Sequence, residues 1–195
     1  MSLSFVECMG FLTVAMSGVS YVFYIREIFA GKTHPHAFSW LIWALVAAVV
    51  FLAQVTEGAG TGAWVTGFTM VICSVIALLA LRRGEKRITL TDWISFLGAL
   101  AAIPVWQMTA DPFYAVLLVV LIDALGFYPT FRKSWRRPEE ETLIAYALNG
   151  FAFSLSLFAL HHLNWTTALY PAFVAVANGV FVIMVMARKR AIGIK

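Results

Sequence analysis

The feature that most constrains the fold is a series of seven apolar runs along the chain. About 20 helical residues cross the ~30 Å hydrocarbon core of a bilayer, and each run is of that order. The runs lack the apolar and polar alternation of barrel strands, so they predict helices. Of the 195 residues, 62% are hydrophobic, more than a soluble domain of this length can bury. We therefore predict an all-α integral membrane protein with transmembrane helices at residues 4–25, 37–55, 63–81, 91–108, 112–132, 142–160 and 165–187.

The positive charges lie on one side of this arrangement. All Lys and Arg residues fall in the connections after the first, third and fifth spans or in the C-terminal tail. Cytoplasmic loops carry such an excess, which predicts an outside N-terminus and a cytoplasmic C-terminus. The pI of about 9.3 then reflects topology, so the expected partner is the lipid bilayer and not nucleic acid. Interfacial tryptophans are expected at the outer boundary (Trp64, Trp106, Trp165) and at the inner one (Trp40, Trp93, Trp135).

A weak internal repeat divides the chain. A shift of 104 residues superposes Phe23-Tyr24 on Phe127-Tyr128, and it brings the second and third spans onto the sixth and seventh. The fourth span has no counterpart, and a single linking helix lets two groups of three spans keep the same orientation. This predicts two parallel three-helix repeats joined by a linker helix (3+1+3), with boundaries at 1–89, 90–110 and 111–195.

With these features the chain resembles the SWEET and PQ-loop superfamily of small transporters. Tyr128-Pro129-Thr130 is similar to the family's kinking proline with a polar follower, with Thr in place of the usual Gln. Asn178 matches the asparagine that the family places midway along the seventh helix to bind substrate. In the first half, Tyr24 is followed by Ile and Arg without a proline. The resemblance implies that the third helix of each repeat lies between the other two. It also implies that the membrane is a bacterial inner (plasma) membrane.

Asp123 stands out as a carboxyl group near the centre of the fifth apolar run. An ionisable group at that depth costs about 2.5–3.5 kcal/mol on insertion scales, so it faces a cavity or a partner. It is interpreted as a proton site or as a counter-ion for a cationic group of a substrate. The alternative is a neutral carboxylic acid hydrogen-bonded to neighbouring helices.

Other residues at membrane depth complete the predicted substrate site. Asn178 and Asn149 carry amides that can bind a polar ligand or join helices. Cys73 and Ser74 occupy the part of the third span where the resemblance implies a second asparagine. Trp43 lies one turn from Trp40 and is interpreted either as packing at the inner boundary or as lining a pocket.

Four residues are expected to act in gating. Pro129 removes a backbone hydrogen bond and bends its helix, and Gly126 lies nearly one turn before it. Tyr128 and its counterpart Tyr24 accompany this hinge in the two halves. Prolines near helix ends also occur simply as terminators, and that alternative stays open.

The predicted function is transport of a small polar solute by alternating access, with proton coupling left open. The alternative is a receptor or sorting protein on the same fold that binds a ligand without moving it. A retinal protein is excluded because residues 169–187 contain no lysine, and no catalytic motif indicates an enzyme. We expect no cofactor and no metal site, and a homo-oligomer stays open as an assembly.

Overall fold

The computed structural model describes residues 4–33, 35, 37–84, 89–136, 138–140 and 142–193. These residues form α-helices joined by short connections, and no strand occurs among them. The prediction of an all-α chain is confirmed. The helices are α1 (Phe5–Phe29), α2 (Ala37–Thr56), α3 (Trp64–Arg83), α4 (Leu90–Thr109), α5 (Pro112–Arg136), α6 (Leu143–Ser156) and α7 (Trp165–Ala191), with short 3-10 turns η1 (Gly60–Ala63), η2 (Pro138–Glu140) and η3 (Leu157–Ala159).

Four helices in the described part of the chain are long and apolar enough to cross a membrane. They are α1, α2, α7 and α3 together with the η1 turn before it. Shorter apolar helical segments cover Phe96–Thr109, Pro112–Ala124 and Leu143–Ala159. The coarse prediction of a helical membrane protein is confirmed at this level.

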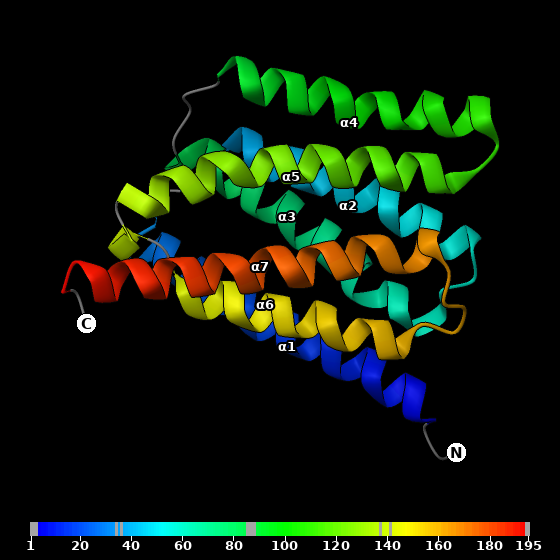
Figure 1. Ribbon diagram of the computed structural model, residues 1–195, viewed down its shortest axis with the longest axis horizontal. Helices are drawn as coiled ribbons and strands as arrows, with labels where there is room; N and C mark the ends of the chain where they lie inside the picture. The colour runs from blue at the N-terminus through cyan, green and yellow to red at the C-terminus, as the bar shows by residue number, and fades with distance from the viewer. Residues whose placement is uncertain are drawn as a thin grey trace.

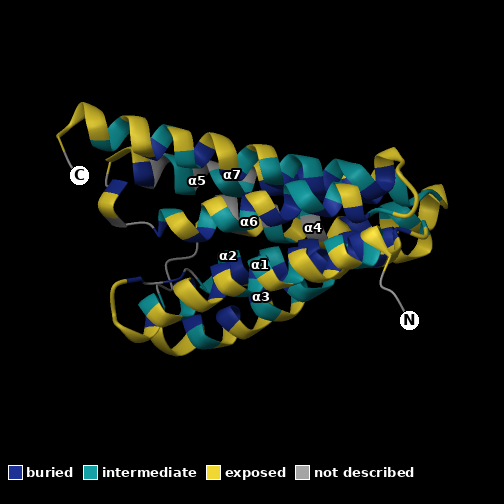
Figure 2. Ribbon diagram, turned by 90° about the horizontal axis from the view of Figure 1, so that it is seen from below, coloured by how far each residue is buried: buried dark blue, intermediate teal, exposed yellow. Residues whose placement is uncertain are grey.

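The helices turn their small and polar residues inward. In α1, a face that includes Thr13, Ser17, Ser20 and Tyr24 is buried, whereas bulky apolar residues such as Phe11 are exposed. Exposed residues cover much of the outer surface of the bundle in Figure 2. Lipid tails solvate apolar side chains as well as a protein interior does, so small and polar residues gather where helices touch. This inversion of the soluble pattern is what a membrane-spanning bundle requires.

We refer to α1, α2 and α3 as the first group and to α5, α6 and α7 as the second, and α1 also packs closely on α6. In the first group α3 contacts both α1 and α2, and in the second α7 contacts both α5 and α6. The groups meet where α1 packs on α6 and α2 packs on α5. The remaining helix, α4, lies along one edge of the bundle against α5 and α2 (Figure 1).

The bundle has two chemically different ends. We call one the basic end, because α1, α3, α5 and α7 finish there and it carries the described arginines of their last turns. The C-terminus lies at this end in Figure 1 and the N-terminus at the other, which we call the distal end. The connections α2–α3, α4–α5 and α6–α7 lie at the distal end.

At the distal end the two groups are hydrogen-bonded to each other. The Thr61 hydroxyl lies 3.1 Å from the carbonyl oxygens of both Val6 and Ala159, so it can donate to either one. The His161 backbone N–H donates to the Ala59 carbonyl at 3.1 Å. The loop after α2 is therefore joined to the loop after α6.

Two more contacts reinforce this junction. The fully buried Gln54 side chain donates from Nε2 to the Thr167 carbonyl at 2.9 Å, which joins α2 to α7. A Cβ atom at Gly62 would lie 2.9 Å from the backbone of Leu160, so only glycine permits this approach. We call the contacts between residues 54–62 and residues 159–167 the distal interlock.

A glycine also determines how closely α6 and α7 pack. A Cβ atom at Gly150 would lie 2.8 Å from the Cβ of Asn178, a separation that real side chains do not adopt. Gly150→Ala should therefore force the helices apart and cost ~1–3 kcal/mol of stability, as overpacking does elsewhere. Thermal unfolding of the purified protein measures the loss.

Gly179→Ala is the matched control, because nothing lies within 4 Å of a Cβ atom there. We expect its free energy of unfolding to stay within ~0.5 kcal/mol of the wild-type value, as is typical of surface substitutions. Equal midpoints for Gly150→Ala and the wild type would contradict the close helix contact.

Candidate functional site

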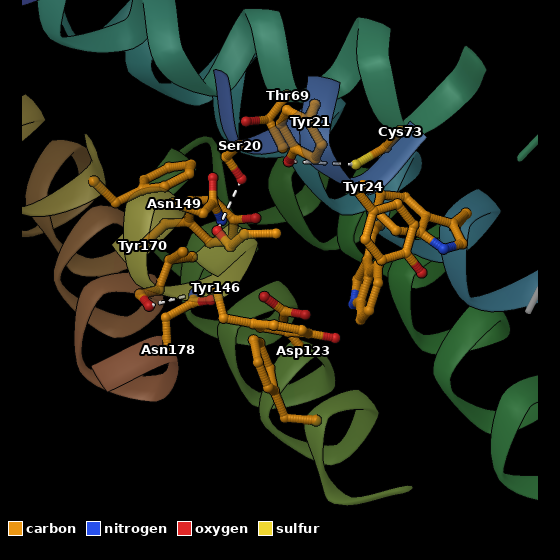
Figure 3. A pocket seen from close by; sticks show the side chains of 16 residues that line it. Ser20, Tyr21, Tyr24, Thr69, Cys73, Asp123, Tyr146, Asn149, Tyr170 and Asn178 are labelled. Carbon is orange, nitrogen blue, oxygen red and sulfur yellow. Dashed lines mark hydrogen bonds between the residues drawn. The ribbon is translucent and has the colours of Figure 1, made fainter. Parts of the chain in front are cut away.

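A pocket lies between the two groups of three helices, and α4 does not line it (Figure 3). Its empty volume is about 630 Å³, a figure that includes the open space at its mouth. The residues that line it are Ser20, Tyr21, Tyr24, Trp40, Trp43, Thr69, Cys73, Asp123, Phe127, Ala145, Tyr146, Asn149, Phe153, Tyr170, Val174 and Asn178.

The pocket extends from the middle of the bundle toward the basic end. Cys73, Asp123 and Asn178 each lie near the midpoint of their helices. Trp40 and Ala145 lie in the first turns of α2 and α6, which begin at the basic end. The distal interlock lies beyond the lining residues, toward the other end of the bundle.

Asp123 contributes the carboxyl group of the pocket. Its side chain is 3% exposed, and Oδ1 has no hydrogen-bond partner among the described residues. The indole of Trp43 faces this carboxyl group and can donate to it through Nε1–H. No Lys, Arg or His occurs among the described residues that line the pocket. A buried carboxyl group without a counter-charge indicates a site for a proton or a ligand rather than a structural ion pair.

The two predicted amides lie in the pocket and are held by their neighbours. Asn178 is buried and donates from Nδ2 to the Val174 carbonyl at 2.8 Å. Asn149 is half-buried, and its Oδ1 accepts from the Ser17 hydroxyl at 3.4 Å. Each amide is therefore oriented by the protein before any ligand arrives.

The two adjacent residues of α3 point in different directions. Cys73 is buried in the pocket wall, with its sulfur 4.0 Å from the Tyr21 hydroxyl. Ser74 is exposed, lines no part of the pocket, and donates its hydroxyl to the Met70 carbonyl at 2.8 Å. The structure does not bring Ser74 to this pocket, because successive helical residues point about 100° apart and Cys73 already faces the bundle.

The predicted gating residues are only partly placed. Tyr24 is buried and lines the pocket, and a Cβ atom at Gly126 would lie 3.8 Å from Trp43 Nε1. The side chains of Tyr128 and Pro129 lie outside the described residues, while the backbone of α5 stays helical through these positions. Trp43 lines the pocket, which agrees with the second of its two interpretations.

A connected set of aromatic rings was not predicted as part of the site. Ring centroids are 4.9 Å apart for Tyr24 and Trp40, 5.0 Å for Trp40 and Trp43, and 6.3 Å for Trp43 and Phe127. Tyr21 joins the set with its centroid 6.3 Å from that of Trp40. We call these five residues the aromatic wall.

Trp40 corrects the prediction of an interfacial anchor, because it is only 6% exposed. Its burial follows from packing between rings of α1 and its neighbour Trp43. The sequence did contain a signal: Ser17, Ser20, Tyr21 and Tyr24 have helical spacing, which places their side chains on one face of α1.

Comparisons with family models, with curated proteins and with solved structures found no match to this chain.

Proposed function

We propose that this chain is a seven-span membrane transporter with a 3+1+3 arrangement that moves a small polar solute by alternating access. The observation that carries the proposal is the position of the pocket. It lies between the two groups of three helices, contains a carboxyl group without a counter-charge, and has the distal interlock beyond it toward one end of the bundle. Binding sites near the midplane between repeats are the common design of such carriers.

The burial pattern supports the repeat. In each group the third helix packs against the other two, and the buried positions recur with the same spacing. Thr69, Cys73, Ile76 and Ala80 of α3 match Val174, Asn178, Phe181 and Val185 of α7 in this way. Ala44, Val46, Ala47, Val50 and Ala53 of α2 likewise match Gly150, Ala152, Phe153, Ser156 and Ala159 at the end of the sixth span.

The pocket itself follows the repeat, because most of its lining residues fall into matched pairs from the two groups. The pairs are Ser20 and Asp123, Tyr24 and Phe127, Trp40 and Tyr146, Trp43 and Asn149, Thr69 and Val174, and Cys73 and Asn178. These pairs differ by one or two residues from the uniform shift of 104, which paired Tyr24 with Tyr128. The pairing supports repeat boundaries at 1–89 and 111–195 with α4, in 90–110, as the linker.

Alternating access requires the distal interlock to open while the basic end closes. The interlock joins the α2–α3 and α6–α7 loops, which are equivalent in the proposed repeat. It consists of separate hydrogen bonds and glycine contacts, and each intramembrane hydrogen bond contributes only about 0.6 kcal/mol. A solute that binds slightly more tightly to one of the two states, with the distal interlock open or closed, can therefore shift the balance between them.

The proposed orientation places the basic end in the cytoplasm. A background lacking Cys8 and Cys73 should carry one new cysteine, either at Leu163 in the distal loop or at Ile192 after α7; both positions are exposed. An impermeant thiol reagent added to intact cells should label Leu163→Cys and should reach Ile192→Cys only after the membrane is opened. Labelling of both positions from the same side would contradict the topology.

The role of Asp123 is tested by Asp123→Asn in proteoliposomes. A thermal-shift screen of sugars, vitamins, amines and nucleosides first selects a compound that stabilises the native protein. If Asp123 carries the coupling proton, uptake of that compound by the wild type should depend on pH and uptake by Asp123→Asn should not. If the carboxyl group is structural, the variant should lose ~0.6 kcal/mol of stability with uptake intact.

Asp111→Asn is the matched control, because it removes a carboxylate that lies outside the pocket and caps the start of α5. Its uptake and pH response should equal those of the wild type. Unchanged pH-dependent uptake in Asp123→Asn would end the coupling proposal, and stabilisation without uptake by the wild type would favour the receptor alternative.

Opening of the distal end is tested by locking it. The backbones of Ala59 and His161 are hydrogen-bonded to each other, so cysteines at these two positions are adjacent across the interlock. In a background without Cys8 and Cys73, oxidation of the pair should abolish uptake, and reduction should restore it. The two single-cysteine variants should be insensitive to oxidation. Full uptake by the cross-linked protein would contradict alternating access.

A further inference from the structure

We infer that the solute is a small organic cation. Its ammonium group would pair with Asp123, and its alkyl groups would lie against the aromatic wall. This inference deepens the proposed function and rests on it in taking the pocket between the two groups of helices as the solute site. It concerns which class of solute binds, and it does not depend on whether the solute is moved.

The first argument is charge. Asp123 is buried, and the described lining of the pocket supplies no basic side chain to balance it. An anionic solute would meet this carboxylate in a low-dielectric site and be repelled. A neutral solute would leave the carboxylate uncompensated or neutral. A cation supplies the missing charge, and pairing offsets the free-energy cost of placing a carboxylate inside the membrane.

The second argument is the composition of the wall next to that carboxyl group. Trp43 faces the carboxyl, and Phe127 follows Asp123 by one turn on α5. Through Trp40 the rings continue to Tyr21 and Tyr24 on α1. Aromatic faces attract cations, with Trp the strongest, and aromatic cages are a common way to bind alkylated ammonium groups.

The third argument is that several polar groups of the pocket already hold one hydrogen bond to the protein. The Ser20 hydroxyl donates to the Ala145 carbonyl at 2.8 Å. Asn149 accepts from Ser17 through Oδ1, and Asn178 donates to Val174 through Nδ2. The Thr69 hydroxyl, by contrast, has no partner among the described residues. Groups that already hold one bond offer fewer further donors and acceptors, so they suit a ligand with one charged group and a short polar tail better than a sugar.

Figure 3 shows how such a ligand would be oriented. The Asp123 carboxyl projects between Tyr24 on one side and Asn178 on the other. Asn149 and Asn178 lie together on the side away from Tyr24. A hydroxyl or carbonyl group on the tail would therefore face the amides while the ammonium group faces Asp123 and the rings.

The test compares matched charged and uncharged probes by thermal shift of the purified protein in detergent. The probes are ethanolamine, its N-methylated derivatives up to choline, and for each the alcohol in which carbon replaces nitrogen. Mildly alkaline pH is used because a proton competes with any cation for a carboxylate. At least one cation should raise the unfolding midpoint in a saturable manner while its carbon analogue does not.

Asp123→Asn should weaken that cation at least about tenfold, which corresponds to ~1.4 kcal/mol. Trp43→Leu should weaken it about threefold through the loss of a cation–π contact, and it keeps the test decisive if Asp123→Asn fails to fold. Asp111→Asn and Ser74→Ala should bind as the wild type does, because neither residue lines the pocket.

Two results would overturn the inference. One is that no cation in the series stabilises the wild type more than its carbon analogue. The other is that the preference for the cation survives unchanged in Asp123→Asn or, if that variant does not fold, in Trp43→Leu. The outcome is separate from that of transport: a cation that binds but is not taken up into proteoliposomes contradicts the transporter and leaves this inference intact. Uptake of a neutral solute without cation binding supports the transporter and contradicts this inference.

Discussion

The structure depends on one constraint, namely that polar groups within the hydrocarbon must find partners inside the protein. The Ser20 hydroxyl and the Nε2 group of Gln54 meet it by donating to backbone carbonyls of other helices. Thr61 satisfies the same constraint, because its hydroxyl lies within hydrogen-bond distance of the carbonyls of Val6 and Ala159 in two different segments. These bonds, together with glycines that let backbones approach, determine which helices touch. Five buried side-chain atoms in the described part of the chain are exceptions without a partner, and Asp123 Oδ1 is the only carboxyl oxygen among them.

The Asp123 carboxyl links the fold to the site. The positions paired in the proposed repeat are not chemically equal: where the first half has Ser20, the second has Asp123, and where the first has Trp43, the second has Asn149. In that proposal the differences between paired residues give the pocket its chemistry.

The helices could be predicted closely from the sequence, because a continuous apolar run of sufficient length has few alternatives in a membrane. The second helix was expected over 37–55 and spans Ala37–Thr56. The first, fifth and seventh helices extend four residues beyond their predicted ends, to Phe29, Arg136 and Ala191. The sixth gives way to a 3-10 turn after Ser156, four residues before its predicted end.

The site could be predicted only in part. Asp123, Asn178 and Asn149 were found because a polar residue at membrane depth is conspicuous in the sequence. Ser74 lies outside the pocket, because the direction of a side chain depends on which neighbour its helix meets. Trp43 and Tyr24 of the aromatic wall were among the predicted site residues, but Trp40 was not, because Trp near the end of a span is also expected at the interface. Only the contact between α1, α2 and α5 shows that Trp40 faces inward.

The distal interlock has a consequence for how a carrier of this kind would respond from its two sides. A solute that arrives at the distal end binds only the fraction of molecules in which the interlock is open, so its apparent dissociation constant is raised by the inverse of that fraction. Each ~1.4 kcal/mol by which the interlock favours closure makes the apparent affinity from that side tenfold weaker. A solute that arrives from the basic end reaches the same pocket without this loss of apparent affinity. Such a carrier saturates at a lower solute concentration on the face of the membrane that the basic end meets than on the distal face. The intrinsic chemistry of its site is the same from both sides.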